Sequence, residues 1–566
     1  MQPHRGFARP AWEGLAVMAL TSALSGLPVA AQTPPPPPAE PAGLIQQIQT
    51  VIQAHFPAGD KPAELQVNGS PVRLAAGVPC FYQRRGFAPA WSSEAGADAE
   101  SSGELLAVIE DSVYDGLRPN DYHPADLKRR LEAVRTHPDP NEFAELDLLL
   151  TDVFLNLASD LRYGRVNPRT RAGCEPPGPA TKEPPSEPDL PAMLDSALKE
   201  RRVRSVLEEL APQTEAYKTL RLAVAFYRGI VARGGWPLVP AGPTLHPGDR
   251  NPRVAALRER LEASSFVDPA AGGRDLFDAP LQAAVRAFQE RNGLEPDGGV
   301  GKGTLAALNV PAADRLKQIE VNLERWRWLP RDLGDRYIMV NTAGFLLDVV
   351  EEGRGVLGMR VVVGKPYTKS PTFSGKMTYL VIDPYWNVPS SIVTKEIVPH
   401  MRRDPGYLTH EGMEVTTSRG GAPVSPASID WQKTSGAGLV VRQKPGPKNA
   451  LGRYKFIFPN SFDVYLHDTP SRSLFQRAER SFSHGCIRLE KPLDLALYLL
   501  QDEPAWTPES LKAAVAAGKE RVVTLHHPIP VHLAYWTVWV DDAGVVQFRK
   551  DLYERDKPLL EMLAAE

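Results

Sequence analysis

The chain has 566 residues, which is more than one hydrophobic core accommodates, so we expect about three or four domains. Apolar residues make up 42% of the chain, as is usual for a globular protein, and a net charge of −3 with a pI near 6.5 argues against a nucleic-acid-binding protein. The 55 prolines gather in linkers, and only three cysteines occur: Cys80, Cys174 and Cys486.

The N-terminus has the pattern of an export signal. A basic start precedes a short apolar stretch at residues 14–27, and Val29–Ala31 fits a small-residue cleavage site. The apolar stretch is shorter than the roughly 20 residues that a membrane span needs. We therefore predict a signal peptide over residues 1–31, with an uncleaved membrane anchor as the alternative. A Pro-rich linker follows over residues 32–43.

Helical periodicity dominates residues 44–242, which we predict to be a helical domain. Apolar residues recur at helical spacing in residues 44–56, and residues 146–166 form the longest such run, which we expect to be the central helix. A Pro- and Glu-rich stretch at residues 174–191 has no apolar face and is typical of a loop. Aromatic stretches such as residues 78–91 are expected to serve packing.

A second compact unit is predicted over residues 243–310. Gly299–Lys302 lacks the spacing of a phosphate-binding loop, so the sequence argues against nucleotide binding. A connecting segment over residues 311–335, with a helix at 319–330, leads to the rest of the chain. The unit contains three predicted amphipathic helices, at residues 252–263, 281–294 and 301–309.

Strand-like periodicity begins at residue 336 and predicts a mainly-β domain, sandwich or barrel-like, over residues 336–566. A Gly-, Pro-, Ser- and Lys-rich insertion at about 387–453 interrupts the strands and is long for a bare surface loop. Helices are expected at 491–501 and 508–518, and closing strands within 522–556. The fold class is thus multidomain α+β. The other predicted strands lie at 336–341, 345–350, 358–364, 378–383, 438–443 and 462–467.

The stretch SFSHGCIRLE, residues 481–490, contains Cys486 among residues that can make its thiol a nucleophile. A thiol is a useful nucleophile at neutral pH only if a neighbour lowers its pKa or accepts its proton, and His467, in VYLHDTP, can accept the proton of Cys486. Gly485 lacks a Cβ, so a carbonyl group can approach the backbone, and the N–H groups of Gly485 and Cys486 can stabilise an oxyanion. A lone Cys is usually a small buried apolar residue, but the density of these groups favours a nucleophile.

The pattern His467…Ser-His-Gly-Cys (483–486)…Arg488 resembles the signature of the L,D-transpeptidase (YkuD-type) catalytic domain. The resemblance implies an all-β fold in which Cys486 is the nucleophile and His467 the general base, on neighbouring β elements under an open groove. It also implies that the insertion at 387–453 caps this groove.

Several neighbours have expected supporting roles. The ring of His467 needs a third group to orient it, either the backbone carbonyl of Asp468 or its carboxylate; the family often carries Gly or Ser there, which favours the carbonyl. Tyr465 lies on the same strand face as His467 and is either an oxyanion donor or a packing residue. We expect Ser483 and His484 to hold the Cys loop in shape.

Arg488 and Trp386 are the candidate substrate-binding residues. Arg488 either binds a substrate carboxylate or fixes the loop by backbone hydrogen bonds, and its apolar neighbours Ile487 and Leu489 favour the structural role. Trp386, at the root of the insertion, either lines the groove or fills a core.

No metal and no bound organic cofactor are predicted. The histidines at residues 526–532 have no Cys or acidic partner at zinc-site spacing. In an exported protein Cys80 and Cys174 can pair, which leaves Cys486 as the free thiol.

Two further resemblances concern the rest of the chain. The pattern from Phe277 to Asn309 resembles the three-helix peptidoglycan-binding domain, although any small helical bundle shows the same apolar spacing. Residues 78–91 and 112–123 resemble the N-terminal scaffold region of the long, Gram-negative type of L,D-transpeptidase.

Together the resemblances imply a periplasmic enzyme of the cell envelope whose partners are peptidoglycan tetrapeptide stems. Cys486 would attack the peptide bond before the terminal D-Ala, D-Ala would leave, and the amine of a neighbouring stem would resolve the thioester into a 3→3 cross-link. Acylation by carbapenems is also implied. The alternatives are an L,D-carboxypeptidase that uses water, and a non-enzymatic glycan-binding scaffold, against which the Cys/His pair argues. The sequence leaves the acceptor open: a second stem, a lysine of an outer-membrane protein, or water.

Overall fold

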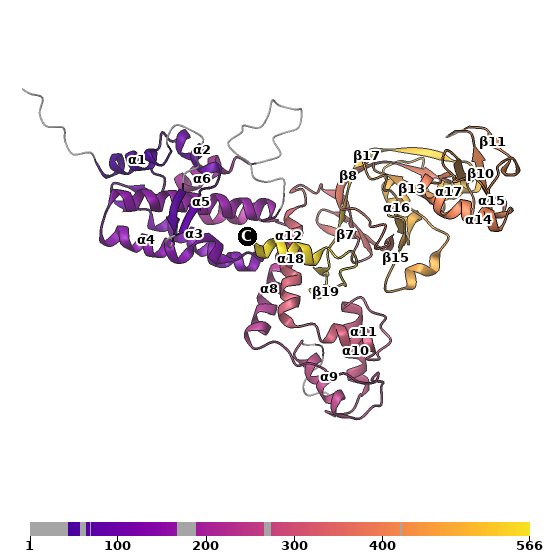
Figure 1. Ribbon diagram of the computed structural model, residues 1–566, viewed down its shortest axis with the longest axis horizontal. Helices are drawn as coiled ribbons and strands as arrows, with labels where there is room; N and C mark the ends of the chain where they lie inside the picture. The colour runs from indigo at the N-terminus through magenta and orange to yellow at the C-terminus, as the bar shows by residue number, and fades with distance from the viewer. Residues whose placement is uncertain are drawn as a thin grey trace, which may run out of the picture. The chain divides into compact units, whose positions relative to one another are not determined.

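The computed structural model describes residues 43–56, 64–67, 70–166, 188–264, 266, 273–418 and 421–565. The predicted signal peptide, nearly all of the Pro-rich linker, and Cys174 with most of its Pro/Glu-rich loop lie outside these residues. Within the described ranges, no helix is both long and apolar enough to cross a bilayer. The fold class is confirmed as multidomain α+β: helices, then a small three-helix region, then a mainly-β region follow one another along the chain (Figure 1).

The N-terminal helical domain is organised around α5 (Pro140–Tyr163), which is buried along most of its length, as its apolar run predicts. The buried carboxylate of Asp147 accepts the hydroxyl of Tyr82 at 2.7 Å and the N–H groups of Ala90 and Trp91 at 2.8 Å. The aromatic stretch at 78–91 therefore packs against α5. The other helices are α1 (Leu44–Ala54), α2 (Gly77–Arg84), α3 (Ala99–Asp111), α4 (Pro124–Thr136), α6 (Leu190–Glu200), α7 (Val203–Leu210) and α8 (Glu215–Ala232), with two short hairpins, β1 (Glu64–Val67) with β2 (Ser70–Arg73) and β3 (Ser92–Ser93) with β4 (Gly96–Ala97).

The three-helix region has an apolar core of its own. Gln289 fixes the turn before the third helix, because its amide nitrogen donates to the Asp297 carboxylate at 2.7 Å and to the Thr304 hydroxyl at 3.1 Å, while its oxygen accepts the Gly298 N–H at 2.8 Å. The helices are α9 (Pro252–Glu262), α10 (Ala279–Arg291) and α11 (Lys302–Leu308).

The connecting helix α12 spans Ala312–Arg327 and so begins before the predicted residue 319, because its first turns are largely polar and carry little apolar periodicity. Glu324 on this helix is wholly buried. Its carboxylate pairs with Arg327 at 2.6 Å and accepts the backbone N–H groups of Arg165 and Val166 at 3.2 Å. The Glu324 carboxylate, paired with Arg327 of the same helix, thus joins α12 to the segment that follows α5.

We expect Glu324→Ala to lower the free energy of unfolding by about 3–5 kcal/mol, because it leaves the buried Arg327 guanidinium without its anion. The exposed pair Glu132–Arg135, at 2.6 Å, offers a matched control. Glu132→Ala should lower the free energy of unfolding far less, since water screens exposed pairs. Urea unfolding of the two variants checks this, and equal losses would contradict the burial argument.

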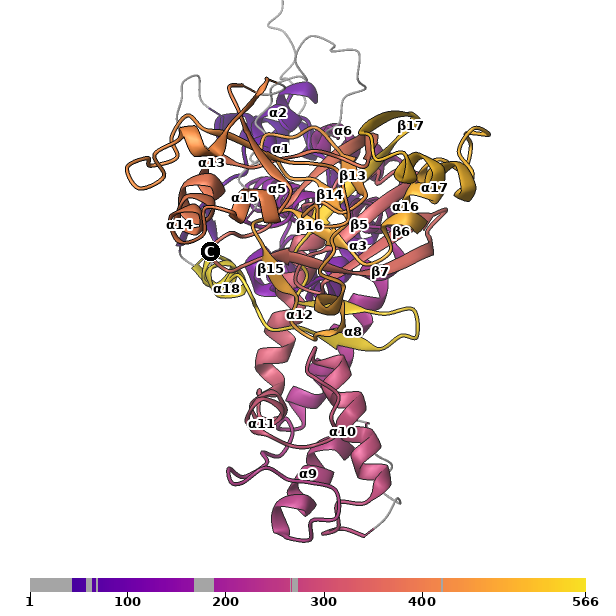
Figure 2. The same ribbon diagram turned by 90° about the vertical axis from the view of Figure 1, so that its right-hand side faces the viewer.

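The mainly-β region holds a nine-stranded sheet of order β15-β7-β16-β14-β13-β8-β17-β5-β6, several strands of which are visible side by side in Figure 2. An additional antiparallel pairing of β6 with β7 closes the strands on themselves, in agreement with the predicted barrel-like domain. Helices α16 (Pro492–Leu499) and α17 (Pro508–Ala516) contribute to its core. The strands are β5 (Arg336–Asn341), β6 (Leu346–Glu351), β7 (Arg354–Gly364), β8 (Phe373–Ile382), β13 (Tyr454–Ile457), β14 (Leu466–His467), β15 (Ser481–Ser483), β16 (Ile487–Leu489) and β17 (Arg521–Ala534).

Two strand predictions are wrong in detail. The strand expected at 462–467 shortens to β14, because residues before it form a turn. The run at 438–443 forms β12 (Val440–Gln443), which belongs to a separate sheet of order β11-β10-β12-β9 inside the insertion. Alternating apolar residues reveal a strand but not the sheet to which it belongs.

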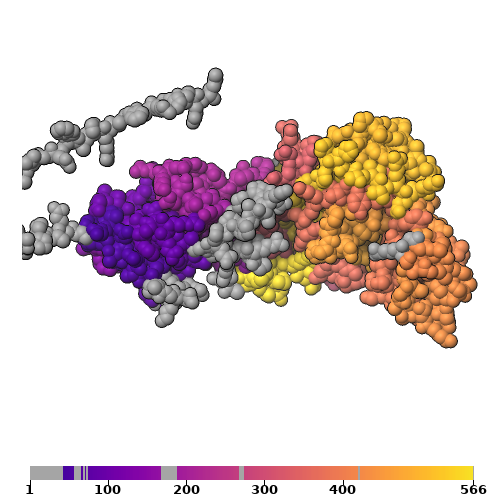
Figure 3. All heavy atoms as spheres, turned by 90° about the horizontal axis from the view of Figure 1, so that it is seen from above, coloured from indigo at the N-terminus to yellow at the C-terminus, as the bar shows by residue number. Residues whose placement is uncertain are grey.

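The insertion is a small folded unit with its own apolar core, in which Val393, Trp431 and Val441 take part, and it is coloured orange in Figure 3. Its buried apolar residues are spread along the chain from Val388 to Val441, so composition alone gives the appearance of a loop. Its remaining elements are β9 (Trp386–Asn387), α13 (Ser390–Ile392), the π-helix η3 (Val393–Ile397), α14 (Val398–Arg403), α15 (Tyr407–His410), β10 (Met413–Thr416) and β11 (Pro423–Val424).

The C-terminal segment continues beyond β17 with β18 (Val538–Val540), β19 (Val546–Phe548) and a helix absent from the prediction, α18 (Asp556–Ala565). Asp556 accepts from Arg325 of α12 at 2.6 Å and from the Thr537 hydroxyl at 2.8 Å. This segment therefore contacts the connecting helix as well as the sheet.

Candidate active site

The register of β14 and β16 brings the predicted catalytic residues together. The two strands run parallel, with Leu466 beside Ile487 and His467 beside Arg488. Leu466 and Ile487 are buried in the domain core. Because side chains alternate between the faces of a strand, His467 and Arg488 lie on the opposite face, and the flanking residues Tyr465 and Cys486 lie there too.

The sulfur of Cys486 is half-buried and lies beside the backbone N–H and the hydroxyl of Tyr465. The Asp463 carbonyl lies 3.9 Å from the sulfur. Burial raises the pKa of the Cys486 thiol, and the Tyr465 hydrogen bonds, followed by the charges of Lys455 and Arg488, oppose that rise. The resting residue is therefore a thiol at neutral pH, and its attack requires a base.

His467 is buried, and its Nδ1 lies 2.6 Å from the backbone carbonyl of Asp468. A carbonyl only accepts, so Nδ1 carries the proton and Nε2 keeps a free lone pair. Burial, and after it the charge of Arg488, lowers the pKa of His467 to about 3. The ring is neutral at pH 7 and can serve as a base.

The structure places the carbonyl of Asp468, not its carboxylate, against the histidine ring. The carboxylate instead accepts the N–H groups of Arg453 at 2.8 Å and Thr469 at 2.6 Å and pairs with Arg472 at 3.1 Å. It thereby fixes the turn that presents the carbonyl.

Tyr465 contacts both members of the pair. Its ring centroid lies 5.6 Å from that of His467, edge to face. Lys455 lies on β13, the other strand beside β14, and its Nζ lies 4.1 Å from the centroid of the Tyr465 ring. Because its hydroxyl lies beside the sulfur, Tyr465 does more than fill space on the sheet. Lys455 was not predicted; the alternation of YKFI shows only that it faces away from the core.

The loop before Cys486 is held by Ser483. The Ser483 hydroxyl donates to the Cys486 carbonyl at 2.6 Å and accepts the N–H of Gly485 at 3.0 Å. Gly485 has φ = +124°, a conformation that side chains rarely adopt. The Gly485 N–H is thus already bonded, which leaves the Cys486 N–H as the backbone donor of the predicted pair.

His484 points away from the sulfur toward the insertion. Its Nε2 lies 2.7 Å from the carboxylate of Glu396 in η3. The insertion therefore contacts the residue two positions before the thiol. This contact follows from tertiary structure, and the motif alone gives no indication of its partner.

Arg488 forms no ion pair with any residue of the described ranges, and its buried Nε has no hydrogen-bond partner there. Its charge acts on both Cys486 and His467. Trp386 is separate from this group: it lies on β9, partly buried, and packs against the insertion core. The contacts observed for Trp386 are thus with the insertion core.

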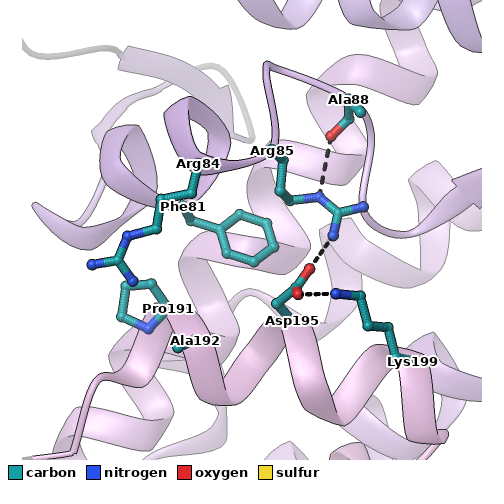
Figure 4. Close-up of a pocket in the computed structure, with 8 residues that line it drawn as sticks. All are labelled: Phe81, Arg84, Arg85, Ala88, Pro191, Ala192, Asp195 and Lys199. Atoms are coloured by element: carbon teal, nitrogen blue, oxygen red, sulfur yellow. Dashed lines mark hydrogen bonds and ion pairs between the residues drawn. The ribbon is translucent and has the colours of Figure 1, made fainter. Parts of the chain in front are cut away.

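Two surface hollows lie away from the thiol. One, of 370 Å³, lies between α2 and α6, where the Asp195 carboxylate pairs with Arg85 and with Lys199 (Figure 4). The other, of 430 Å³, is bordered by Asp383, Arg453 and Lys512. In the described part of the chain, no group of three His, Cys, Asp or Glu side chains is placed to hold a metal ion.

Comparison with known families divides the chain into three matched parts. Residues 76–223 match the "Scaffold domain", residues 250–308 the "Putative peptidoglycan binding domain", and residues 335–509 the "L,D-transpeptidase catalytic domain". The match over residues 335–509 contains Tyr465, His467, Cys486 and Arg488.

Individual proteins give a narrower comparison. A protein from Haemophilus influenzae named "Putative L,D-transpeptidase" is 34% identical over 244 residues, which are 43% of this chain and 49% of that protein. The chain thus spans about half the length of this relative. The N-acetylmuramoyl-L-alanine amidase CwlM of Mycobacterium tuberculosis is 43% identical over 75 residues, 12% of this chain and 18% of that protein. A solved L,D-transpeptidase from Xylanimonas cellulosilytica is 18% identical to this chain, and the match covers 52% of this chain and 98% of the solved chain, with a TM-score of 0.18.

Proposed function

We propose that this chain, which carries an L,D-transpeptidase catalytic domain together with a scaffold domain and a peptidoglycan-binding domain, is a cell-envelope enzyme that forms 3→3 cross-links between peptidoglycan stems. The observation that supports it most is the arrangement on one face of β14 and β16: a thiol beside Tyr465, and a neutral histidine held by a backbone carbonyl. A nucleophile and a base suffice for acyl transfer in two steps.

In the first step the Cys486 sulfur attacks the carbonyl carbon of the bond before the terminal D-Ala, and the thiol proton passes to Nε2 of His467. The carbonyl oxygen becomes an oxyanion, for which the Cys486 N–H is the nearest backbone donor. When the C–N bond breaks, His467 returns the proton to the leaving amine of D-Ala. A thioester on Cys486 remains.

In the second step the amine on the D-centre of a neighbouring stem attacks the thioester. His467 takes the amine proton, the C–S bond breaks, and the released thiolate regains the proton from His467. The positive charge of Arg488, close to both groups, favours the anionic sulfur during attack and departure. The contact of Glu396 with His484 supports a capping role for the insertion over this site.

Mass spectrometry of the purified protein with disaccharide-tetrapeptide tests the proposal. We expect a dimer that lacks one D-Ala, together with a thioester adduct on the peptide that contains Cys486. If tripeptide forms and no dimer appears, the enzyme is an L,D-carboxypeptidase, in which water resolves the same adduct. The absence of both the product and the adduct would contradict the proposed donor.

A further inference from the structure

The loop that follows β7 packs directly against the backbone of the Cys486 loop. Ser370 in this loop is fully buried, and its hydroxyl donates to the Gly485 carbonyl at 2.7 Å and accepts the Gly364 N–H at 3.0 Å. A Cβ on Gly364 would lie 3.1 Å from the Cα of Gly485 and 2.0 Å from the Thr368 carbonyl oxygen. The close approach that lets Ser370 reach Gly485 therefore requires glycine at 364.

The bond to the Gly485 carbonyl also determines where the next N–H points. The peptide group between Gly485 and Cys486 is planar and trans, so its C=O and N–H are directed oppositely. With the C=O held by Ser370, the Cys486 N–H is directed away from Ser370. Across the described ranges, no acceptor takes this N–H, whereas the Gly485 N–H is bonded to Ser483. The Cys486 N–H is thus available to an oxyanion and cannot rotate away.

Tyr553, in the C-terminal segment, braces the same loop. Its hydroxyl donates to the Gly364 carbonyl at 2.7 Å and accepts the Ser370 N–H at 3.2 Å. Its ring stacks on Tyr535 with centroids 5.3 Å apart, and its N–H donates to the Tyr535 hydroxyl at 2.8 Å. Tyr553 lies beyond residue 509, where the match to the catalytic-domain family ends.

We propose that Ser370 and Tyr553 are positioning residues, which hold the Gly485–Cys486 peptide so that its N–H stabilises the oxyanion of acyl transfer, and that the C-terminal segment is therefore part of the catalytic apparatus. The proposal rests on the acyl-transfer chemistry of the proposed function. It does not depend on which acyl donor the enzyme uses.

Two small reagents separate this role from a general loss of reactivity. Acetyl transfer from p-nitrophenyl acetate to the Cys486 sulfur passes through a tetrahedral oxyanion and releases p-nitrophenolate. Alkylation by iodoacetamide forms a C–S bond, releases iodide and develops no oxyanion. We expect Ser370→Ala to slow acetylation at least about tenfold, since an oxyanion donor is worth about 10²–10³ in rate, and to leave alkylation within about twofold. Mass spectrometry of the peptide that contains Cys486 measures both rates. This measurement does not require that the enzyme act on peptidoglycan.

Tyr553→Phe is the second variant and keeps the test valid if Ser370→Ala fails to fold; it should act in the same direction. Ser112→Ala is the matched control, because the buried Ser112 hydroxyl also donates to a backbone carbonyl, that of Ile109 at 2.6 Å, far along the chain from Cys486. It should change neither rate. Equal slowing of both reactions in the Ser370 and Tyr553 variants would reduce their role to loop folding, and unchanged acetylation in both would overturn the proposal outright.

Discussion

Cys486→Ala is expected to abolish cross-linked product and every acyl adduct, carbapenem adducts included, with a loss of at least about 10⁴-fold in rate. The other described cysteine, Cys80, lies in α2 of the helical domain, so no second thiol at the site replaces the sulfur. The variant should keep its thermal unfolding transition, because the side chain is only half-buried and loses a single sulfur atom. Intact-mass measurement with a carbapenem or tetrapeptide gives the adduct, and differential scanning fluorimetry gives the transition.

Cys80→Ala is the matched control for this experiment. Cys80 is buried in α2 of the helical domain, where it is 7% exposed, and takes no part in the β14–β16 arrangement. Its replacement should leave the acyl adduct and the product unchanged. If the Cys486→Ala variant still forms product, or if the adduct disappears in the Cys80→Ala variant, then Cys486 is not the nucleophile.

Cys486 and His467, the proposed catalytic pair, can be predicted from the sequence because local motifs carry them. SHGC and the upstream histidine are recognisable without any fold, and the argument that the Asp468 carbonyl orients the ring matches the 2.6 Å contact. Lys455 and Ser370 escaped prediction because they act through strand pairing and loop packing between segments distant in sequence. Tyr553 lies 67 positions after Cys486 along the chain, in a stretch without a motif, so only the folded structure relates the two.

The structure of the insertion could be predicted only in part from the sequence. Its length and position were predicted, and a capping role was inferred from resemblance. Its apolar core was not predicted, because Val393, Trp431 and Val441 come from segments that are well separated along the chain. Hydrophobic periodicity detects single elements, whereas this core combines residues of the helical run 390–403 with residues from distant segments.

His467→Gln is expected to slow acylation of Cys486 by about 10²–10⁴-fold at pH 7, because glutamine can bond to the Asp468 carbonyl but cannot accept the thiol proton. The neutral ring of the wild type can accept it, since burial, with Arg488 second, lowers the pKa of His467 to about 3. His527→Gln, at an exposed site, should leave acylation unchanged. Rapid-quench mass spectrometry gives the three rates, and a wild-type rate in the His467 variant would assign the base elsewhere.

The same lowered pKa makes a prediction about stability. In the folded protein the pKa of His467 is about 3, and in the unfolded chain it is near 6.5, so between these pH values the unfolded chain binds a proton that the folded protein excludes. As pH falls from 6.5 toward 3, the wild type should lose stability relative to His467→Gln by about 1.4 kcal/mol per pH unit, whereas above 6.5 the difference should stay constant. Urea unfolding of both proteins at several pH values measures this difference. A thiolate–imidazolium pair in the resting enzyme would instead raise the histidine pKa, and the wild type would then gain stability relative to the variant as the pH falls through that raised pKa, above 6.5. A stability difference that stays constant above pH 6.5 therefore distinguishes a neutral base that awaits substrate from a pre-formed ion pair.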